Sequence, residues 1–226
     1  RDPRGIEVLE PIEIGGIKQW LHIRGRNLDN PVLLQLHGGG FSYIGWFDEI
    51  QRPWEEYFTV VQWDQRTGKS YQSLEKIGHT ITNEQMIKDT EEVIAHLRNR
   101  LKKDKIFLLG KSYGSYLGMH MVKRHPDWLH AYIGDGQIVS VVGYLQAEYD
   151  HLLSHAKDKK NKILVDKLEK ISPRIDANNR WKSFTAHESF IWQELNSIGK
   201  CFFRFIEQSE FYNSISLAKL ISPHLT

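Results

Sequence analysis

Hydrophobic and polar residues along the first 138 positions predict a series of short strands. Residues 6–14 and 17–23 read as strands joined by Gly15-Gly16, a pair typical of a tight hairpin turn, and we expect them to form an antiparallel edge. Further apolar runs typical of strands follow at 32–37, 58–64, 106–109 and 131–135. Strands therefore dominate the pattern of this part of the chain.

Two segments have helical spacing instead. Thr82-Asn83-Glu84-Gln85 has the spacing of a capping box, and apolar residues recur after it at helical intervals. Beyond about residue 140, Trp, Phe, Leu and Lys recur at helical spacing, with early breaks at Ser172-Pro173 and Asn178-Asn179 and no convincing strand. This change of character predicts a core at 1–139 and a helical subdomain at 140–226.

The segment Gly110-Lys111-Ser112-Tyr113-Gly114 follows one predicted strand and opens a helix. A serine at the apex of so tight a turn has a strained backbone, and glycines two residues to either side keep Cβ atoms from colliding with the strand and the helix. The hydroxyl is pushed out above the sheet, at a helix N-terminus where the Tyr113 N–H can face a developing oxyanion. Because so short a pattern also arises by chance, its context decides its meaning.

The context is two further glycine-containing turns that follow strands upstream. The run 32–37 ends in Gly38-Gly39-Gly40, a loop able to turn backbone N–H groups toward a ligand. The run 58–64 ends in Asp64 and continues as Gln65-Arg66-Thr67-Gly68-Lys69-Ser70. Three such units in succession are not expected by chance.

Together these motifs resemble the α/β-hydrolase superfamily, and within it the proline iminopeptidase-like serine hydrolases. That family has a His-Gly-Gly-Pro-Gly loop, an Asp-Gln-Arg-x-x-Gly-x-Ser turn and a Gly-x-Ser-[Tyr/Trp]-Gly-[Gly/Ser] elbow. They correspond here to His37–Gly40, Asp64–Ser70 and Gly110–Ser115, and His125-Pro126-Asp127 is a fourth match. The motifs cover about residues 20–138. The glycine loop lacks the usual proline, and the Asp64 turn is one residue shorter than the family pattern.

The resemblance implies an α/β fold with a mostly parallel twisted sheet, helices on both faces and a helical cap, for which residues 140–226 are the candidate. Relatives place the triad acid and then the histidine after late strands beyond the cap. No such strand is present, and His224 reads as a loop residue. We therefore expect the last strands and both triad partners to come from sequence not included here, and this chain alone to show little turnover.

The resemblance also implies roles for individual residues. Ser112 would be the nucleophile, and the N–H groups of Gly39 and Tyr113 would form the oxyanion hole. His37 would brace the glycine loop rather than take part in the chemistry. In the cap, Glu188 and Glu194 would hold the free α-amino group of a substrate, and Trp192 would line a pocket for its first side chain. Amphipathic packing is the alternative reading of these three.

Other polar residues at the expected carboxyl edge of the sheet read as structural. An ion pair involving Asp64, Gln65 or Arg66 would fix two loops against each other. Lys111 reads as a side chain packed or solvated beside the site. Asp135 reads as a turn residue, although some α/β hydrolases carry the triad acid after the sixth strand.

The composition restricts the function further. A net charge of +2 from 30 basic and 28 acidic residues predicts neither nucleic-acid nor membrane-surface binding, and the basic run Lys157–Lys162 reads as a solvated helix face or loop. The single cysteine, Cys201, excludes an internal disulfide and argues against structural zinc. No metal or organic cofactor is implied. No signal peptide or membrane span is recognisable, so we expect a cytoplasmic protein.

Three functions follow as hypotheses. The first is a serine hydrolase that removes an N-terminal residue, with proline as the candidate, from small peptides through an acyl-enzyme at Ser112. The second is a carboxylesterase or acyl hydrolase of the same fold, because the fold does not decide the substrate. The third is a catalytically incomplete α/β-hydrolase-like binding module. The oligomeric state is not predicted.

Overall fold

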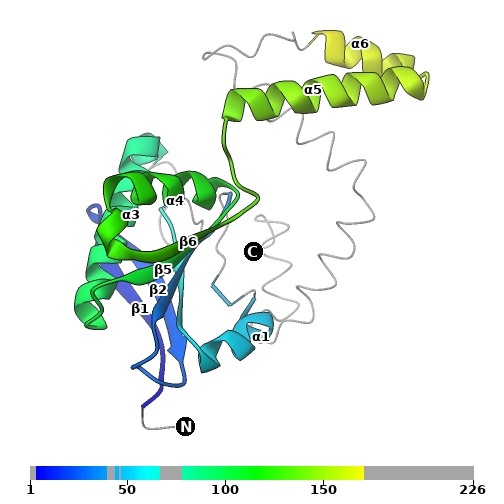
Figure 1. The fold of residues 1–226 in the computed structure, drawn as a ribbon. Coiled ribbons are helices and arrows are strands. Elements are labelled where there is room, and N and C mark those ends of the chain that lie inside the picture. The colour runs from blue at the N-terminus through cyan, green and yellow to red at the C-terminus, as the bar shows by residue number, and fades with distance from the viewer. Residues whose placement is uncertain (1–3, 40–43, 46, 67–77, 171–226) are drawn as a thin grey trace, which may run out of the picture. The chain divides into compact units, whose positions relative to one another are not determined.

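A computed structural model of the chain describes residues 4–39, 44–45, 47–66 and 78–170 (Figure 1). The chain divides after Gln137 into two compact units. The first contains every described strand, and the second is helical where it is described. Each unit is treated separately below.

The first unit contains a six-stranded sheet in the order β1-β2-β4-β3-β5-β6. Its strands are β1 (Ile6–Ile14), β2 (Ile17–Gly25), β3 (Val32–Leu36), β4 (Thr59–Asp64), β5 (Ile106–Lys111) and β6 (Leu129–Asp135). Strands β1, β2 and β4 pair antiparallel in succession, whereas β4, β3, β5 and β6 are parallel. The predicted sheet and its antiparallel edge are therefore confirmed.

The hairpin at that edge has the predicted turn. Ile14 pairs with Ile17, and the two residues between them, Gly15 and Gly16, have φ angles of 54° and 74°. Positive φ at both central residues gives the turn a twist that matches the strands it connects, and glycine adopts it without a Cβ clash.

Helices cover both faces of this sheet (Figure 1). On one face lie α3 (Asn83–Arg100) and α4 (Tyr113–Arg124), and on the other lie the short α1 (Asp48–Gln51) and the 3-10 helix η1 (Arg52–Glu56). Two further 3-10 turns, η2 (Gly78–Thr80) and η3 (Pro126–Trp128), precede α3 and β6. This arrangement agrees with the predicted α/β architecture.

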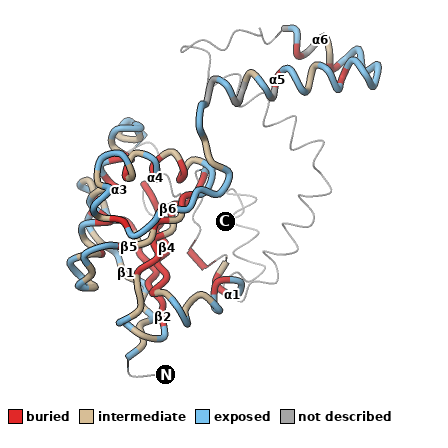
Figure 2. Tube along the Cα trace, in the orientation of Figure 1, coloured by how far each residue is buried: buried red, intermediate tan, exposed pale blue. Residues whose placement is uncertain are grey.

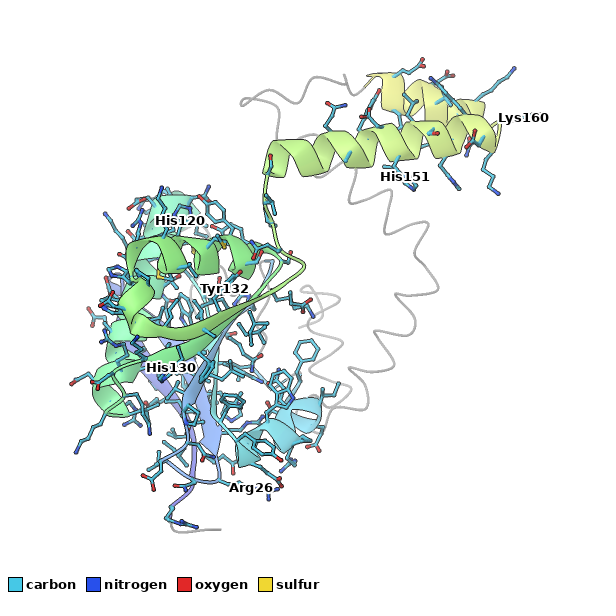
Figure 3. All side chains as sticks on the ribbon, in the orientation of Figure 1. Arg26, His120, His130, Tyr132, His151 and Lys160 are labelled. Carbon is cyan, nitrogen blue, oxygen red and sulfur yellow. The ribbon has the colours of Figure 1, made fainter. Side chains whose placement is uncertain are left out.

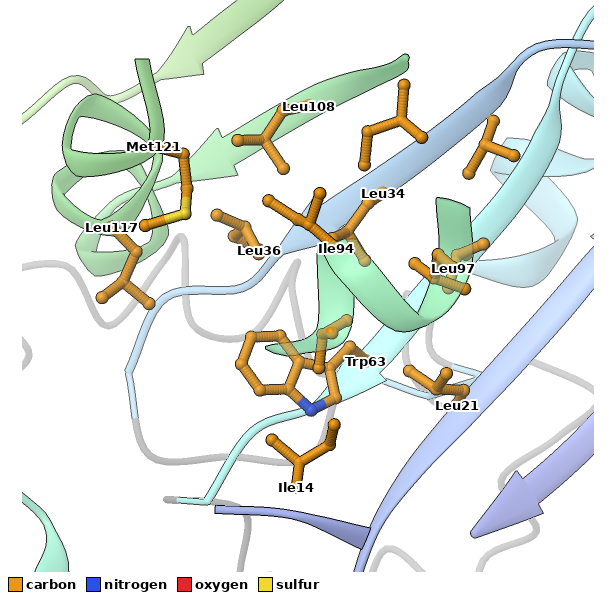
Figure 4. Packing of buried hydrophobic residues seen from close by; sticks show 14 of the residues in the cluster. Ile14, Leu21, Leu34, Leu36, Trp63, Ile94, Leu97, Leu108, Leu117 and Met121 are labelled. Atoms are coloured by element: carbon orange, nitrogen blue, oxygen red, sulfur yellow. The ribbon is translucent and has the colours of Figure 1, made fainter. Parts of the chain in front are cut away.

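The main core lies between the sheet and helices α3 and α4. Figure 2 shows buried residues concentrated along the central strands, and Figure 4 shows the packing of this cluster. Leu34, Trp63 and Leu108 from the sheet pack with Ile94 and Leu117 from the helices, and each is at most 1% exposed. Burial of that apolar surface is the main stabilising contribution of the unit.

The capping prediction for α3 is confirmed in one half only. The Thr82 hydroxyl accepts a hydrogen bond from the Gln85 N–H at 3.1 Å, which satisfies one free donor of the first turn. The Gln85 side chain does not complete a capping box, because its amide donates instead to Asp89 at 2.8 Å.

The described part of the second unit is a pair of helices, α5 (Val141–Asp158) and α6 (Lys162–Lys170). Ser140 caps α5 by accepting the Gly143 N–H at 3.1 Å. The helices pack through Tyr149, Ala156, Leu164 and Leu168. In the part of the chain that the structure describes, no helix is long and apolar enough to cross a bilayer.

Candidate active site

The carboxyl ends of the parallel strands bring the predicted site residues together. Strands β3 and β5 pair in register up to Leu36 and Gly110, and β5 pairs with β6 up to Lys111 and Asp135. Because parallel strands end at the same edge, the segments that follow them lie side by side. The loop after β3, the elbow after β5 and the turn after β6 therefore meet at one edge of the sheet.

Ser112 has the strained conformation expected of an elbow serine. Its φ of 51° and ψ of −120° lie in a region that a residue with a Cβ rarely adopts, at a cost of about 1–3 kcal/mol. The Ser112 N–H donates to the Asp135 carbonyl at 2.9 Å, and the Ser112 carbonyl accepts from the Ser115 N–H at 2.8 Å. The Ser115 hydroxyl donates to the same carbonyl at 2.5 Å. Hydrogen bonds on both sides of the residue hold the turn.

The Ser112 side chain takes no part in capping the helix that follows it. Ser112 is exposed, and its side chain makes no capping hydrogen bond to α4. Within the described residues, no side chain hydrogen-bonds the Ser112 hydroxyl. Ser112 is thus an exposed residue at this edge of the sheet.

The two glycines of the elbow are required by close backbone approach. A Cβ on Gly114 would collide with the backbone of Leu36, and a Cβ on Gly110 would lie 2.8 Å from the Ser115 Cα. Real Cβ atoms do not approach other atoms so closely. Helix α4 can therefore start directly against β3 and β5 only because both positions lack a side chain.

The glycine loop after β3 touches the elbow. A Cβ on Gly38 would lie 2.6 Å from the Ser112 Cβ and 3.2 Å from its hydroxyl oxygen. Gly39 follows with a φ of 70° and is exposed. Tyr113 is the first residue of α4, where N–H groups lack partners within the helix. The three predicted site residues of this unit, Ser112, Gly39 and Tyr113, thus lie in segments that meet.

The Tyr113 side chain is not placed to act as an acid or a base. Its hydroxyl donates to Asn83 at 2.9 Å, and its ring stacks on Tyr116 at 5.7 Å between centroids. Burial raises the pKa of Tyr113 to about 12, so the phenol stays protonated at neutral pH.

His37 braces the glycine loop against the loop after β4. Its Nε2 accepts the Gln65 N–H at 3.2 Å, and the Gln65 side-chain amide donates to the His37 carbonyl at 3.0 Å. Burial lowers the pKa of His37 to about 4, so the ring is neutral and can accept at Nε2. Both bonds join the two loops, in agreement with the bracing role inferred from the sequence.

Arg66, one of the residues for which an ion pair was expected, forms a buried ion pair with a helix. Arg66 pairs with Asp89 of helix α3, with 2.8 Å between Nε and Oδ2, and both side chains are at most 1% exposed. Arg66 also donates to the Gly15 carbonyl at 2.8 Å and to the Thr80 hydroxyl at 3.0 Å. The ion pair ties the loop to α3 and the hairpin, whereas the two loops are joined by the hydrogen bonds of Gln65. A buried guanidinium requires a buried carboxylate, and α3 supplies it.

Lys111 and Asp135 flank Ser112 at the end of their strands. Their side chains are about half exposed and lie 3.8 Å apart, so this contact contributes little stability. Both line a pocket of about 280 Å³ together with Phe47, Trp54 and Leu109. Asp135 also supports the elbow through its backbone carbonyl, which accepts the Ser112 N–H.

Tyr132 of β6 fixes α4 beside the elbow. Tyr132 lies beside α4 (Figure 3). Its ring occupies the space that a Cβ on Gly118 would need, and its hydroxyl donates to the Ser115 carbonyl at 3.0 Å. The same hydroxyl lies 2.6 Å from the Gln137 Oε1, so its single proton is shared between these two acceptors. The first turn of α4, which carries Tyr113, is therefore held from the side of β6.

The comparison with protein families agrees with this geometry. The family model described as serine aminopeptidase, S33, matches residues 30–209. The chain belongs to this family. A relative, the "Probable aminopeptidase YbaC" of Bacillus subtilis (strain 168), is 38% identical over 165 residues, which are 72% of this chain and 52% of the relative. The chain thus spans about half the length of that curated relative.

A solved structure supports the α/β-hydrolase fold for this S33 family member. A proline iminopeptidase-related protein from Thermus thermophilus matches with a TM-score of 0.55 and 19% identity over 77% of this chain and 59% of that protein. An epoxide hydrolase from Vigna radiata matches with a TM-score of 0.47 and 23% identity over 57% of this chain and 38% of the enzyme. The fold predicted from the motifs is confirmed.

Several predicted residues of this S33 family member lie outside the described residues. They are Glu188, Glu194 and Trp192 of the predicted substrate site, and also Gly40, Cys201 and His224. Within the described ranges, no cluster of His, Cys, Asp or Glu has the form of a metal site.

A buried polar cluster beside the glycine loop was not predicted. Its buried members are Gln62 of β4, Asp48 and Gln51 of α1 and Arg24 of β2, and the half-buried Gln35 of β3 hydrogen-bonds Gln51. The available signal was a polar residue inside an apolar strand run, as at Gln35 and Gln62. That signal indicates a buried polar group but does not name its partners.

Proposed function

We propose that the protein is a serine hydrolase that removes an N-terminal residue from small peptides through an acyl-enzyme at Ser112, with proline as the candidate residue. The observation that carries the proposal is the exposed Ser112 on a strained elbow, in contact with the glycine loop. Membership of the S33 serine aminopeptidase family and the similarity to an aminopeptidase of Bacillus subtilis support this chemistry.

In the proposed reaction, the Ser112 oxygen attacks the carbonyl carbon of the first peptide bond. A carbon–oxygen bond forms, and the carbonyl oxygen becomes an oxyanion that the N–H groups of Gly39 and Tyr113 stabilise. The amine of the rest of the peptide leaves with a proton, and water then hydrolyses the ester. Loss of one such donor typically slows the reaction about 10²–10³-fold.

The serine proton requires a general base. Within the described residues no side chain hydrogen-bonds the Ser112 hydroxyl, and the His37 ring is held by Gln65. We therefore assign the base, and the acid that orients it, to residues outside the described ones. The chemistry needs only water as a second substrate, so the proposal includes no metal or organic cofactor.

The proposed peptide substrate depends on the helical part of the chain. A free α-ammonium group that leaves water needs a carboxylate to offset its desolvation. Glu188 and Glu194 are the proposed carboxylates, and Trp192 is the proposed wall for the first side chain. An acyl ester carries no ammonium group, so an esterase would not need these carboxylates.

The test is labelling of the full-length gene product with a fluorophosphonate, which phosphonylates an activated serine. The unsubstituted protein should react with one equivalent at Ser112, and the Ser112→Ala variant should not react. A well-folded full-length sample that fails to label would refute the proposed chemistry.

The substrate class is tested separately with proline anilide and short acyl esters. Faster cleavage of the anilide, with loss of that preference in Glu188→Gln or Glu194→Gln, would support an aminopeptidase. Ester cleavage without anilide cleavage would reject the peptide substrate but retain Ser112 as the nucleophile.

A further inference from the structure

The loop that carries Gly39 is fixed at both ends by buried side chains. At the N-terminal end of the loop, directly after β3, Gln65 hydrogen-bonds His37 through both its backbone and its side chain. At the C-terminal end of the loop, before α1, the Gly45 N–H donates to the Oε1 of Gln62 at 2.9 Å. Both glutamines belong to the same stretch of chain, since Gln62 lies in β4 and Gln65 follows it.

Gln62 is the centre of a hydrogen-bonded cluster, and both its Oε1 and its Nε2 are hydrogen-bonded. Its Nε2 donates to Asp48 Oδ1 at 3.1 Å and to Gln51 Oε1 at 2.8 Å, while its Oε1 accepts from Gly45. Gln62 is 4% exposed, Asp48 8% and Gln51 5%. Because buried polar groups without partners are costly, this geometry holds Gln62 in one orientation.

The residues around Gln62 are themselves anchored to the sheet. The Asp48 Oδ2 pairs with Arg24 of β2 at 2.9 Å, and Arg24 also contacts Glu55 of η1 at 3.1 Å. Gln51 exchanges two hydrogen bonds with Gln35 of β3, at 2.9 and 2.8 Å. The two ends of α1, Asp48 and Gln51, are therefore fixed to β2, β3 and β4 on the face of the sheet opposite α3 and α4 (Figure 1).

We propose that Gln62 is a positioning residue for the oxyanion hole: by anchoring Gly45, it restricts the glycine loop and so the place of the Gly39 N–H relative to Ser112. A loop fixed at two ends has fewer conformations than a loop fixed at one end. A shift of about 1 Å in such a donor can slow the reaction about 100-fold. This inference rests on the function proposed above.

The test compares three variants of the full-length gene product. Gln62→Met has a similar length but removes every hydrogen bond of the amide. Gln62→Glu keeps an acceptor for the Gly45 N–H but loses both donors and places a carboxylate beside Asp48. Gln35→Met removes another amide of the cluster, one that is half-buried and has no hydrogen bond to Gly45.

Two readouts separate positioning from stability. The first is the second-order rate of Ser112 labelling by a fluorophosphonate, measured where circular dichroism shows each variant folded. The second is hydrogen exchange of the Gly45 amide, which reports the anchor without any catalysis. If Gln62→Met does not fold, Gln62→Asn, which is shorter by one methylene, replaces it.

We expect Gln62→Met to label at least about tenfold more slowly and its Gly45 amide to exchange faster. Gln35→Met should label within about twofold of the unsubstituted protein, and Gln62→Glu should recover most of the rate although it is less stable. A purely structural role would lower stability in all three variants and leave the labelling rate of the folded molecules unchanged.

The outcomes also separate this inference from the proposed function. Equal labelling rates for Gln62→Met and the unsubstituted protein would overturn the inference alone. Equal exchange of the Gly45 amide in both proteins would do the same. If the unsubstituted protein does not label, the proposed function fails, and the catalytic part of the inference fails with it.

Discussion

The buried pair Arg66–Asp89 makes the strongest stability prediction. The Asp89 side chain is fully buried and the Arg66 side chain is 1% exposed. Asp89 accepts from Arg66 at 2.8 and 3.0 Å, and also from Gln19 at 2.9 Å and Gln85 at 2.8 Å. The carboxylate therefore has a complete set of donors, and the guanidinium depends on it for charge compensation.

Replacing Asp89 by Ala should destabilise the protein by about 3–5 kcal/mol. The reason is that the Arg66 guanidinium stays buried without a charged partner among the described residues, where two neutral acceptors remain, the Gly15 carbonyl and the Thr80 hydroxyl. The double variant Arg66→Met with Asp89→Leu removes both charges and fills the space with apolar groups. Its loss should be smaller than the sum of the two single losses, since neither charge remains unpaired.

The assay is urea denaturation of the full-length gene product, followed by tryptophan fluorescence. The matched control is Arg26→Met, which breaks an exposed pair with Glu56 in which the side chains are 59% and 50% exposed. Exposed pairs contribute about 0–1 kcal/mol, so this control should change little. An Asp89→Ala variant that loses no more than the Arg26→Met control would refute the reasoning.

Three further predictions concern pH and local geometry. Burial lowers the pKa of His37 to about 4, so on acidification the unfolded chain takes up the proton before the folded protein does. The free energy of unfolding should therefore fall by about 3 kcal/mol from pH 6.5 to 4. Urea denaturation at each pH measures this fall, which should be smaller in the His37→Asn variant. Gly38→Ala should slow Ser112 labelling at least about tenfold and cost about 1–3 kcal/mol, whereas Gly78→Ala, where a Cβ meets nothing within 4 Å, should change neither. Thr82→Ala should cost about 1 kcal/mol, seen as a lower Tm, because the Gln85 N–H loses its cap.

The elements of the fold could be predicted because their signals are local. Gly15-Gly16 and the apolar runs around it specify a hairpin by turn chemistry and strand period alone. The strand order could not be obtained in this way. It places β3 between β4 and β5, and no local signal in the sequence specifies that neighbour relation.

The polar contacts of the site were harder to predict than its backbone. The sequence places Arg66 just after a strand and indicates a structural ion pair there, but its partner Asp89 lies 23 positions away on a helix. Gln85 has the spacing of a capping-box residue, yet the buried charge of Asp89 attracts its amide. Periodicity records which positions are buried, whereas hydrogen-bond partners depend on how separate elements pack in three dimensions.

The glycines of the motifs explain why a short pattern can specify an elbow. A Cβ on Gly38 would meet Ser112, a Cβ on Gly110 would meet Ser115, and a Cβ on Gly114 would meet Leu36. Each glycine thus marks a place where two backbones approach too closely for a side chain. These constraints are steric, so they would hold whether or not Ser112 is activated by a base. A motif of this kind therefore specifies the geometry of the turn, and only the reactivity of the Ser112 hydroxyl can establish its chemistry.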